Sequence, residues 1–148
     1  MKTIGSRIDE IILVLEKEVP NAEEAALNTL LGAYAYRIFN QGKATDGSKI
    51  GDYKEGRYKN NVRKDGGYQV GYVDLQLTGG LFFSIVIGDN GPRKVLGYNN
   101  IDAAKIAGYN EERYSKNIFL PSQEEQDIAR NAFLDYLREK IQQLFNSW

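Results

Sequence analysis

Four pairs of adjacent acidic residues come closest, in residue type and spacing, to catalytic chemistry. They are Asp9/Glu10, Glu23/Glu24, Glu111/Glu112 and Glu124/Glu125. Paired carboxylates can serve glycoside hydrolysis or metal binding. Neighbours on a helix point in different directions, however, and three of these pairs fall in predicted first turns, where acidic residues complement the helix dipole. We therefore predict no catalytic and no metal-binding residues among them.

The composition narrows the chemistry further, because the 148 residues include no cysteine and no histidine. Disulfides, Ser–His and Cys–His nucleophile pairs and the commonest zinc sites are therefore excluded. The glycines after Thr78 do not form a phosphate loop, since no Lys-Ser or Lys-Thr follows and no helix is predicted there. We expect a protein that is not an enzyme and that has no cofactor and no small-molecule substrate.

Length and charge suggest an ordinary small globular protein. With 42% hydrophobic residues the chain is long enough for one domain, predicted over residues 1–148. Lys and Arg number 19 and Asp and Glu 20, so no global field indicates nucleic acid or a membrane as partner. The apolar run at 11–15 is too short for a signal peptide, and no stretch approaches the roughly 20 apolar residues of a membrane span. We expect a soluble protein made in a cytoplasm.

The first part of the chain, residues 1–41, is predicted to be helical. Apolar residues recur at helical spacing over residues 6–17, and Pro20 is expected to end this first helix. Asn21 is expected to cap a second helix, which Gly42 ends because glycine accepts the left-handed conformation. The pattern therefore predicts an N-terminal helix pair.

Residues 42–67 are predicted to form a long basic loop or arm, because they contain six glycines and few aliphatic residues. Two interpretations are open: an arm that lies on nucleic-acid phosphate or an acidic neighbour, or a solvated loop whose lysines keep it soluble. Under the first, the candidate residues facing DNA or a partner are Lys54, Arg57, Lys59, Arg63 and Lys64. Tyr53 and Tyr58, interleaved with them, are candidate subunit contacts.

A small antiparallel β-sheet is predicted over residues 68–98. Residues 68–77 are assigned to a first strand, and residues 81–87 to a second with Phe83 inward and Phe82 outward. An exposed Phe82 beside Val86 is a candidate subunit contact, and the alternative is a sheet covered by helices on both faces. Asp89-Asn90-Gly91 is a hairpin turn signal, so residues 93–98 are expected to return antiparallel.

The last part of the chain is predicted to hold a short helix and a long one. Residues 99–121 are assigned to a short helix over 101–107, begun near Asn100 or Asp102 and ended by Gly108, followed by a loop. Ser122 and Glu125 form a capping box before an amphipathic helix over residues 122–146. This helix is expected to cover one face of the sheet, and the predicted fold class is α+β.

Three short segments, in this order, resemble the small neck and tail-completion proteins of tailed bacteriophages, also called virion morphogenesis proteins. The first is Arg37-Ile38-Phe39-Asn40-Gln41-Gly42 running into Thr45-Asp46-Gly47. The second is Leu77-Thr78-Gly79-Gly80-Leu81-Phe82-Phe83-Ser84-Ile85, similar to a Thr-Gly-x-Leu-x-x-Ser-Ile segment. The third is Ile118-Phe119-Leu120-Pro121-Ser122-Gln123-Glu124-Glu125, similar to the entry into the family's last helix.

The resemblance implies an α+β subunit that works in a homo-oligomeric ring around the DNA channel of a virion assembled in the bacterial cytoplasm. Its implied partners are other phage neck or tail proteins and the DNA that passes through the channel. Tail terminator, head-completion protein and another neck ring remain alternatives. A different alternative is a nucleic-acid-binding module that uses the basic 43–64 arm; it predicts salt-sensitive DNA binding by a monomer.

Overall fold

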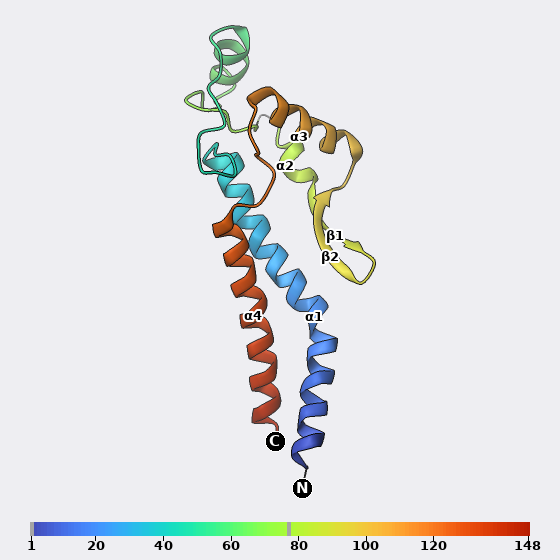
Figure 1. Cartoon of the computed structure of the whole chain (residues 1–148). Helices are drawn as coiled ribbons and strands as arrows, with labels where there is room; N and C mark the ends of the chain where they lie inside the picture. Colours follow the sequence, from blue (N-terminus) through green and yellow to red (C-terminus); the bar gives the residue numbers. More distant parts are fainter. Residues whose placement is uncertain (1, 77) are drawn as a thin grey trace.

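The computed structural model describes residues 2–76 and 78–148 (Figure 1). Its fold is α+β, as predicted, with a helical N-terminal region, a two-stranded antiparallel sheet and a long C-terminal helix. The elements follow one another as α1 (Ile4–Ala35), η1 (Tyr36–Asn40), η2 (Tyr58–Lys64), α2 (Gly80–Ser84), β1 (Ile85–Asn90), β2 (Arg93–Tyr98), α3 (Ile101–Tyr114) and α4 (Gln123–Asn146). The segments η1 and η2 are π-helical.

The predicted pair of N-terminal helices is one continuous helix, α1, with Pro20 inside it. Proline removes one helical hydrogen bond and crowds the preceding turn, at a cost of about 3 kcal/mol. Ala22, Ala26 and Leu30, which follow the proline, are buried on one face of the helix, and α1 packs along α4. Asn21 caps nothing; its amide donates to Glu18 Oε2 at 3.0 Å. Burial along the helix thus outweighs the local break.

The end of the N-terminal helical region agrees with the prediction for Gly42. After α1 the chain widens into the π-helical turn η1 and stops, and Gly42 takes a left-handed φ of 61°. Tyr34, Ile38 and Phe39 on this last stretch are buried and form part of the main core. The other buried members of that core are Ala35, Ala44, Ile50, Val73, Ile85 and Ile118.

The hairpin is confirmed, but the sheet is smaller than predicted. Strands β1 and β2 pair antiparallel, with Asn90 opposite Arg93 and Gly91 in the turn at φ 60°. The predicted strand over 68–77 is wrong, because the described residues 68–76 are irregular and Leu75 has a positive φ of 52° that no strand accommodates. The last residue of that predicted strand, Leu77, lies outside the described residues.

The second predicted strand, over 81–87, begins as the short helix α2 and becomes extended only at Ile85. A helical turn rotates each side chain by about 100° instead of alternating it, so the predicted faces are also wrong. Phe82 packs edge-to-face on the buried Phe39 with ring centroids 5.4 Å apart, whereas Phe83 is 72% exposed. The predicted inward and outward phenylalanines are therefore exchanged.

Helix α3 begins where predicted and is twice as long. Asn100 caps it, accepting a hydrogen bond from the Ala103 backbone N–H at 2.8 Å. Gly108 does not end it, and the helix continues through residues predicted to be irregular until Ser115, whose φ is 51°. A glycine inside a helix costs about 1 kcal/mol, which the added turns and the buried Ala103 and Ala107 offset.

Helix α4 begins with the predicted capping box. The Ser122 Oγ accepts from the Glu125 N–H at 3.2 Å, and Glu125 Oε2 accepts from the Ser122 N–H at 2.8 Å. Contrary to the prediction, α4 packs antiparallel along α1, and the hairpin also packs on α1 (Figure 1). In that view α1 runs between α4 and the hairpin. The long exposed run of α1 offers α4 a larger apolar partner than a two-stranded sheet does.

Within the described residues, no helix has both the length and the apolar character needed to cross a lipid bilayer.

Candidate interaction surfaces

The four acidic pairs are dispersed, and one member of each makes a hydrogen bond or an ion pair within the fold. Glu10 pairs with Lys2 at 2.7 Å, and Glu23 Oε2 accepts from the Lys94 N–H at 3.1 Å. Glu111 Oε1 accepts from the backbone N–H groups of Ile118 and Phe119. Glu125 is buried in an ion pair with Arg37. Among residues 2–76 and 78–148, no three acidic side chains gather as a metal site would require.

Arg63 was predicted to face DNA or a partner, and this prediction is wrong: the residue anchors the arm over residues 42–67 from inside the fold. Arg63 is only 1% exposed and forms a salt bridge with Asp74 at 3.0 Å. Its guanidinium also donates to the carbonyl oxygens of Gln69 and Gln76, at 3.0 and 2.6 Å. All three guanidinium nitrogens donate hydrogen bonds inside the fold, so this buried residue does not face DNA or a neighbouring ring.

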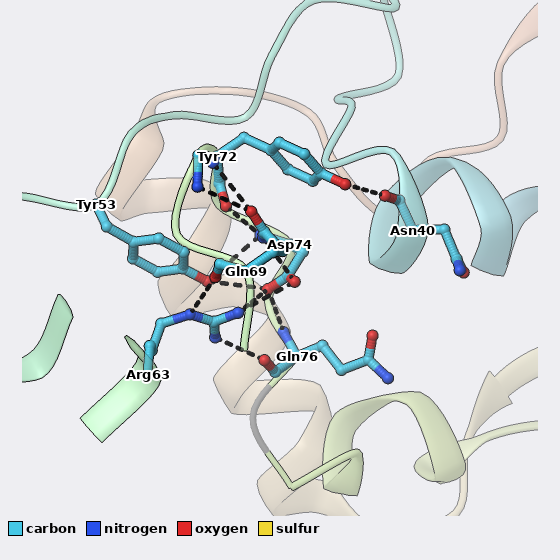
Figure 2. A network of polar contacts seen from close by, with 8 residues as sticks. Asn40, Tyr53, Arg63, Gln69, Tyr72, Asp74 and Gln76 are labelled. Carbon is cyan, nitrogen blue, oxygen red and sulfur yellow. Dashed lines mark hydrogen bonds and ion pairs between the residues drawn. The ribbon is translucent and has the colours of Figure 1, made fainter. Parts of the chain in front are cut away.

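Tyr53 joins this network of Arg63, Gln69, Asp74 and Gln76, which we call the arm lock (Figure 2). The Tyr53 hydroxyl donates to Asp74 Oδ1 at 2.9 Å, and the Arg63 guanidinium lies 4.4 Å from the centroid of the Tyr53 ring. Burial raises the pKa of the Tyr53 hydroxyl well above its ordinary value of 10. Tyr53 is therefore partly buried, with its hydroxyl engaged inside the fold, and it also lines the open cleft described below.

The remaining basic residues of the arm are divided. Lys59 forms a salt bridge with Glu55 one turn earlier, and its side chain is 22% exposed. Lys54, Arg57 and Lys64 are exposed. Tyr58 is 47% exposed, with its ring 5.8 Å from that of Tyr53. Of the five basic residues predicted to face DNA or a partner, Lys54, Arg57 and Lys64 are thus exposed, Lys59 is partly exposed and Arg63 is buried.

A second buried ion pair, which we call the hub lock, joins the end of the N-terminal helical region to the start of α4. The Arg37 Nε donates to Glu125 Oε1 at 2.6 Å, and both side chains are less than 10% exposed. The rest of the guanidinium donates to the carbonyl oxygens of Lys43, Ile118 and Leu120, at 2.9 to 3.1 Å. Sequence analysis missed this pair, because 88 positions separate its members.

The predicted contact at Phe82 and Val86 is largely covered. Phe82 packs against the core through Phe39, and Val86 is half-buried. The exposed aromatic at this place is Phe83, whose ring centroid lies 5.1 Å from that of Phe82. The exposed aromatic side chain therefore lies one residue further along the chain than predicted, because α2 is helical.

An open cleft of about 910 Å³ separates the arm from α3. Asp52, Lys54 and Tyr58 line the cleft on the arm side. On the α3 side it is lined by one acidic and one basic residue, Asp102 and Arg113. Its apolar lining includes Val73, Leu75, Leu81, Ile106 and Tyr114. The cleft has room for a segment of another chain, and nothing in the sequence pattern predicts it.

The free ends of α1 and α4 form a two-helix projection, which we call the stem and define as residues 2–21 and 126–148. No side chain of the stem is buried. Ile4, Ile8, Ile12 and Leu13 on α1 are between 47% and 80% exposed. Leu134 and Phe145 on α4 are 38% and 44% exposed. Apolar exposure on this scale is typical of a protein–protein contact.

Contacts between the two chain ends close the tip of the stem. The Trp148 indole N–H donates to Glu10 Oε2 at 2.8 Å, and the Arg7 guanidinium lies 5.0 Å from the centroid of the Trp148 ring. Hydrogen bonds from Lys2, which is the larger cause, and from Trp148 lower the pKa of the Glu10 carboxyl below its ordinary value of 4.5. Trp148 is the only tryptophan of the chain, so its fluorescence reports on this tip.

Comparison of the chain with family models, with curated proteins and with solved structures finds no match.

Proposed function

We propose that this chain is a structural, non-enzymatic subunit of a tailed-phage neck or tail-completion ring. The observation that carries the proposal is that the three segments which resemble that family contact one another. Arg37 of the first segment pairs with Glu125 of the third, and Thr45 Oγ1 donates to the Leu120 carbonyl at 2.7 Å. Phe82 of the second segment packs on Phe39 of the first.

This convergence supports the proposal because each segment alone is a weak signal. Capped helices and Thr-Gly turns occur in many unrelated proteins. The residues of these segments, however, lie up to 88 positions apart in sequence and contact one another in the folded chain. Contacts of this kind determine how the elements of a fold are arranged. A resemblance that falls on the framework favours a shared fold more than one that falls on exposed turns.

The surfaces suit an assembly part. Exposed aliphatic residues line the stem, and Phe83 and Tyr109 are 72% and 66% exposed on the body of the molecule. The stripe of Ile4, Ile8 and Ile12 along one face of α1 is the kind of exposed apolar surface that marks a protein–protein contact. In the proposed ring, Lys54, Arg57 and Lys64 face DNA in the channel or a neighbouring ring, while the locked Arg63 holds the arm in shape.

The proposal is tested by measuring the native mass of the purified protein across a concentration series, at low and moderate salt, with electron microscopy of the largest species. Closed rings, formed alone or with a phage neck partner, are the expected result. A monomer that ignores such partners and binds DNA with a steep salt dependence would refute it in favour of a nucleic-acid-binding module.

A charge-reversal variant tests the arm separately. Lys54→Glu with Arg57→Glu alters two exposed residues, so we expect a folded subunit that fails to incorporate into particles or to pass DNA. The matched control is Lys105→Glu on α3, which is equally exposed and lies outside the arm. Unchanged assembly of the arm variant would remove the arm from the proposed function.

A further inference from the structure

We propose that the stem is a self-association surface on which the stem of a second copy of this chain packs, to give a four-helix bundle. The inference deepens the proposed function and rests on it in so far as that function requires self-association. It places a two-fold contact on the stem, at Ile4, Ile8 and Ile12, which pairs two copies and is separate from the head-to-tail contacts that close a ring.

The stem has no interior of its own. None of its side chains in α1 or α4 is buried, although α1 and α4 face each other along it. Directly beyond the stem the situation changes: Ala22 is 0% exposed, and Ala26 and Leu30 are 8% and 7% exposed. Two helices alone cannot enclose a core, and helical bundles reach buried positions only with a third or fourth helix.

The exposed apolar stripe of the stem has the same direction as a buried face of α1. Ile8 and Ile12 precede Ala26 and Leu30 by 18 positions each, about five full turns, so the four side chains project from one face of α1. Near its C-terminal end this face is covered: Leu30 lies with Leu96 and Tyr98 of β2 around one small cavity. Near its N-terminal end Ile8 and Ile12 remain 51% and 47% exposed. The stem thus continues a buried face without its cover.

The charge of the stem indicates which kind of partner fits it. The stem carries six basic and seven acidic side chains, so it is nearly neutral and has no attraction for nucleic acid or an anionic membrane. Both signs occur on each helix, for example Glu16 with Lys17 on α1 and Asp135 with Arg138 on α4. A second copy brings the same apolar stripe and the same mixed charges, which allows a self-complementary two-fold contact.

The size of the surface agrees with such a contact. Eighteen helical residues span roughly 27 Å, and two packed helices have axes about 9 Å apart. One side of the stem therefore has a footprint on the order of 500 Å², and its accessible area is larger because side chains protrude. Stable interfaces bury about 800 Å² on each partner. Two stems are thus large enough to hold together with modest help from the rest of the molecule.

The test compares the oligomeric state of the unaltered protein with that of the variant Ile8→Glu with Ile12→Glu, by light scattering over a concentration series. Both positions are about half exposed and glutamate favours helices, so the variant is expected to fold, which circular dichroism checks. We expect the unaltered protein to self-associate and the variant to do so at least about 100-fold more weakly, because it buries charge instead of aliphatic surface. Ile4→Glu, at an 80% exposed position, is a second variant with the same expected direction.

The matched control is Leu13→Glu, because Leu13 is 63% exposed but lies about 100° around the helix from Ile12. It is expected to leave self-association unchanged. An unaltered protein that stays monomeric alone, or stem variants that associate normally, overturns the inference. If rings of unchanged mass still form after the stem substitutions, the proposed function stands and the stem contact is refuted. If the unaltered protein forms only dimers, and the stem substitutions abolish them, the stem contact is supported and the proposed ring is refuted.

Discussion

The hub lock between Arg37 and Glu125 is the interaction whose removal has the largest predicted effect. Glu125→Ala leaves the guanidinium, which is 7% exposed, without its counter-charge. Breaking a buried ion pair from one side costs about 3 to 5 kcal/mol. The Ser122 N–H also loses its acceptor, which adds about 1 kcal/mol. The expected loss of about 4 to 6 kcal/mol is a large part of the roughly 5 to 15 kcal/mol that stabilises a typical domain.

The assay is urea unfolding followed by circular dichroism, with the free energy extrapolated to water. The matched control is Asp135→Ala, which removes one partner of an exposed 3.0 Å pair whose side chains are 70% and 72% exposed. An exposed pair of this kind contributes at most about 1 kcal/mol, so the control is expected to unfold almost as the unaltered protein does.

A double variant separates the pair from its surroundings. Arg37→Met with Glu125→Ala leaves no buried charge, although the carbonyl groups of Lys43, Ile118 and Leu120 lose their donors. We expect the double variant to lose about 2 to 3 kcal/mol less than the two single variants together. A loss below about 1 kcal/mol for Glu125→Ala, or strict additivity in the double variant, would refute the argument that the pair is buried and coupled.

Three further predictions concern the backbone and the tip of the stem. Gly42→Ala is expected to lower the free energy of unfolding by more than 2 kcal/mol, because the added Cβ would lie 2.5 Å from the Val73 carbonyl oxygen. The control Gly47→Ala also has a left-handed φ, of 81°, but no atom lies within 4 Å, so it is expected to cost about 1 kcal/mol. Equal urea midpoints for the two variants would contradict this reasoning. Pro20→Ala is expected to raise the unfolding free energy by about 1 to 3 kcal/mol by restoring a helical hydrogen bond, and a lower value would show that α1 needs the proline. On acidification, Trp148 fluorescence is expected to change with a midpoint below pH 4.5, because the pKa of the Glu10 carboxyl is lowered in the folded state. The contribution of the Glu10 contacts to stability is therefore present above pH 4.5 and is lost as the pH falls through the lowered pKa. Glu10→Gln should abolish the transition, and a midpoint at or above 4.5 would contradict the contact.

The features that were predicted correctly depend on residues close in sequence. The Ser122 capping box, the Asn100 cap and the turn at Gly91 each arise from groups within four positions of one another. Such groups meet as soon as the local backbone forms, so their residue types alone indicate the structure.

The errors occur where distant packing outweighs local preference. Residues 81–84 are aromatic and β-prone, but they form a helical turn that seats Phe82 on Phe39, more than 40 positions away. Pro20 is a strong local break, but the burial of Ala22 and Ala26 keeps α1 continuous. Intrinsic propensities amount to about 1 kcal/mol per ordinary residue, less than one buried aromatic side chain contributes.

By itself, the sequence determined the α+β class, the long capped C-terminal helix, the hairpin, and the lack of cysteine and histidine chemistry. Only the tertiary structure decided the roles of the charged residues. Arg63 and Arg37 are ordinary basic residues in a linear pattern, and each becomes internal because a carboxylate, at Asp74 and at Glu125, meets it away from water. The exposure of the stem was likewise decided in three dimensions, because an apolar helix face is buried or free according to what else the fold places against it.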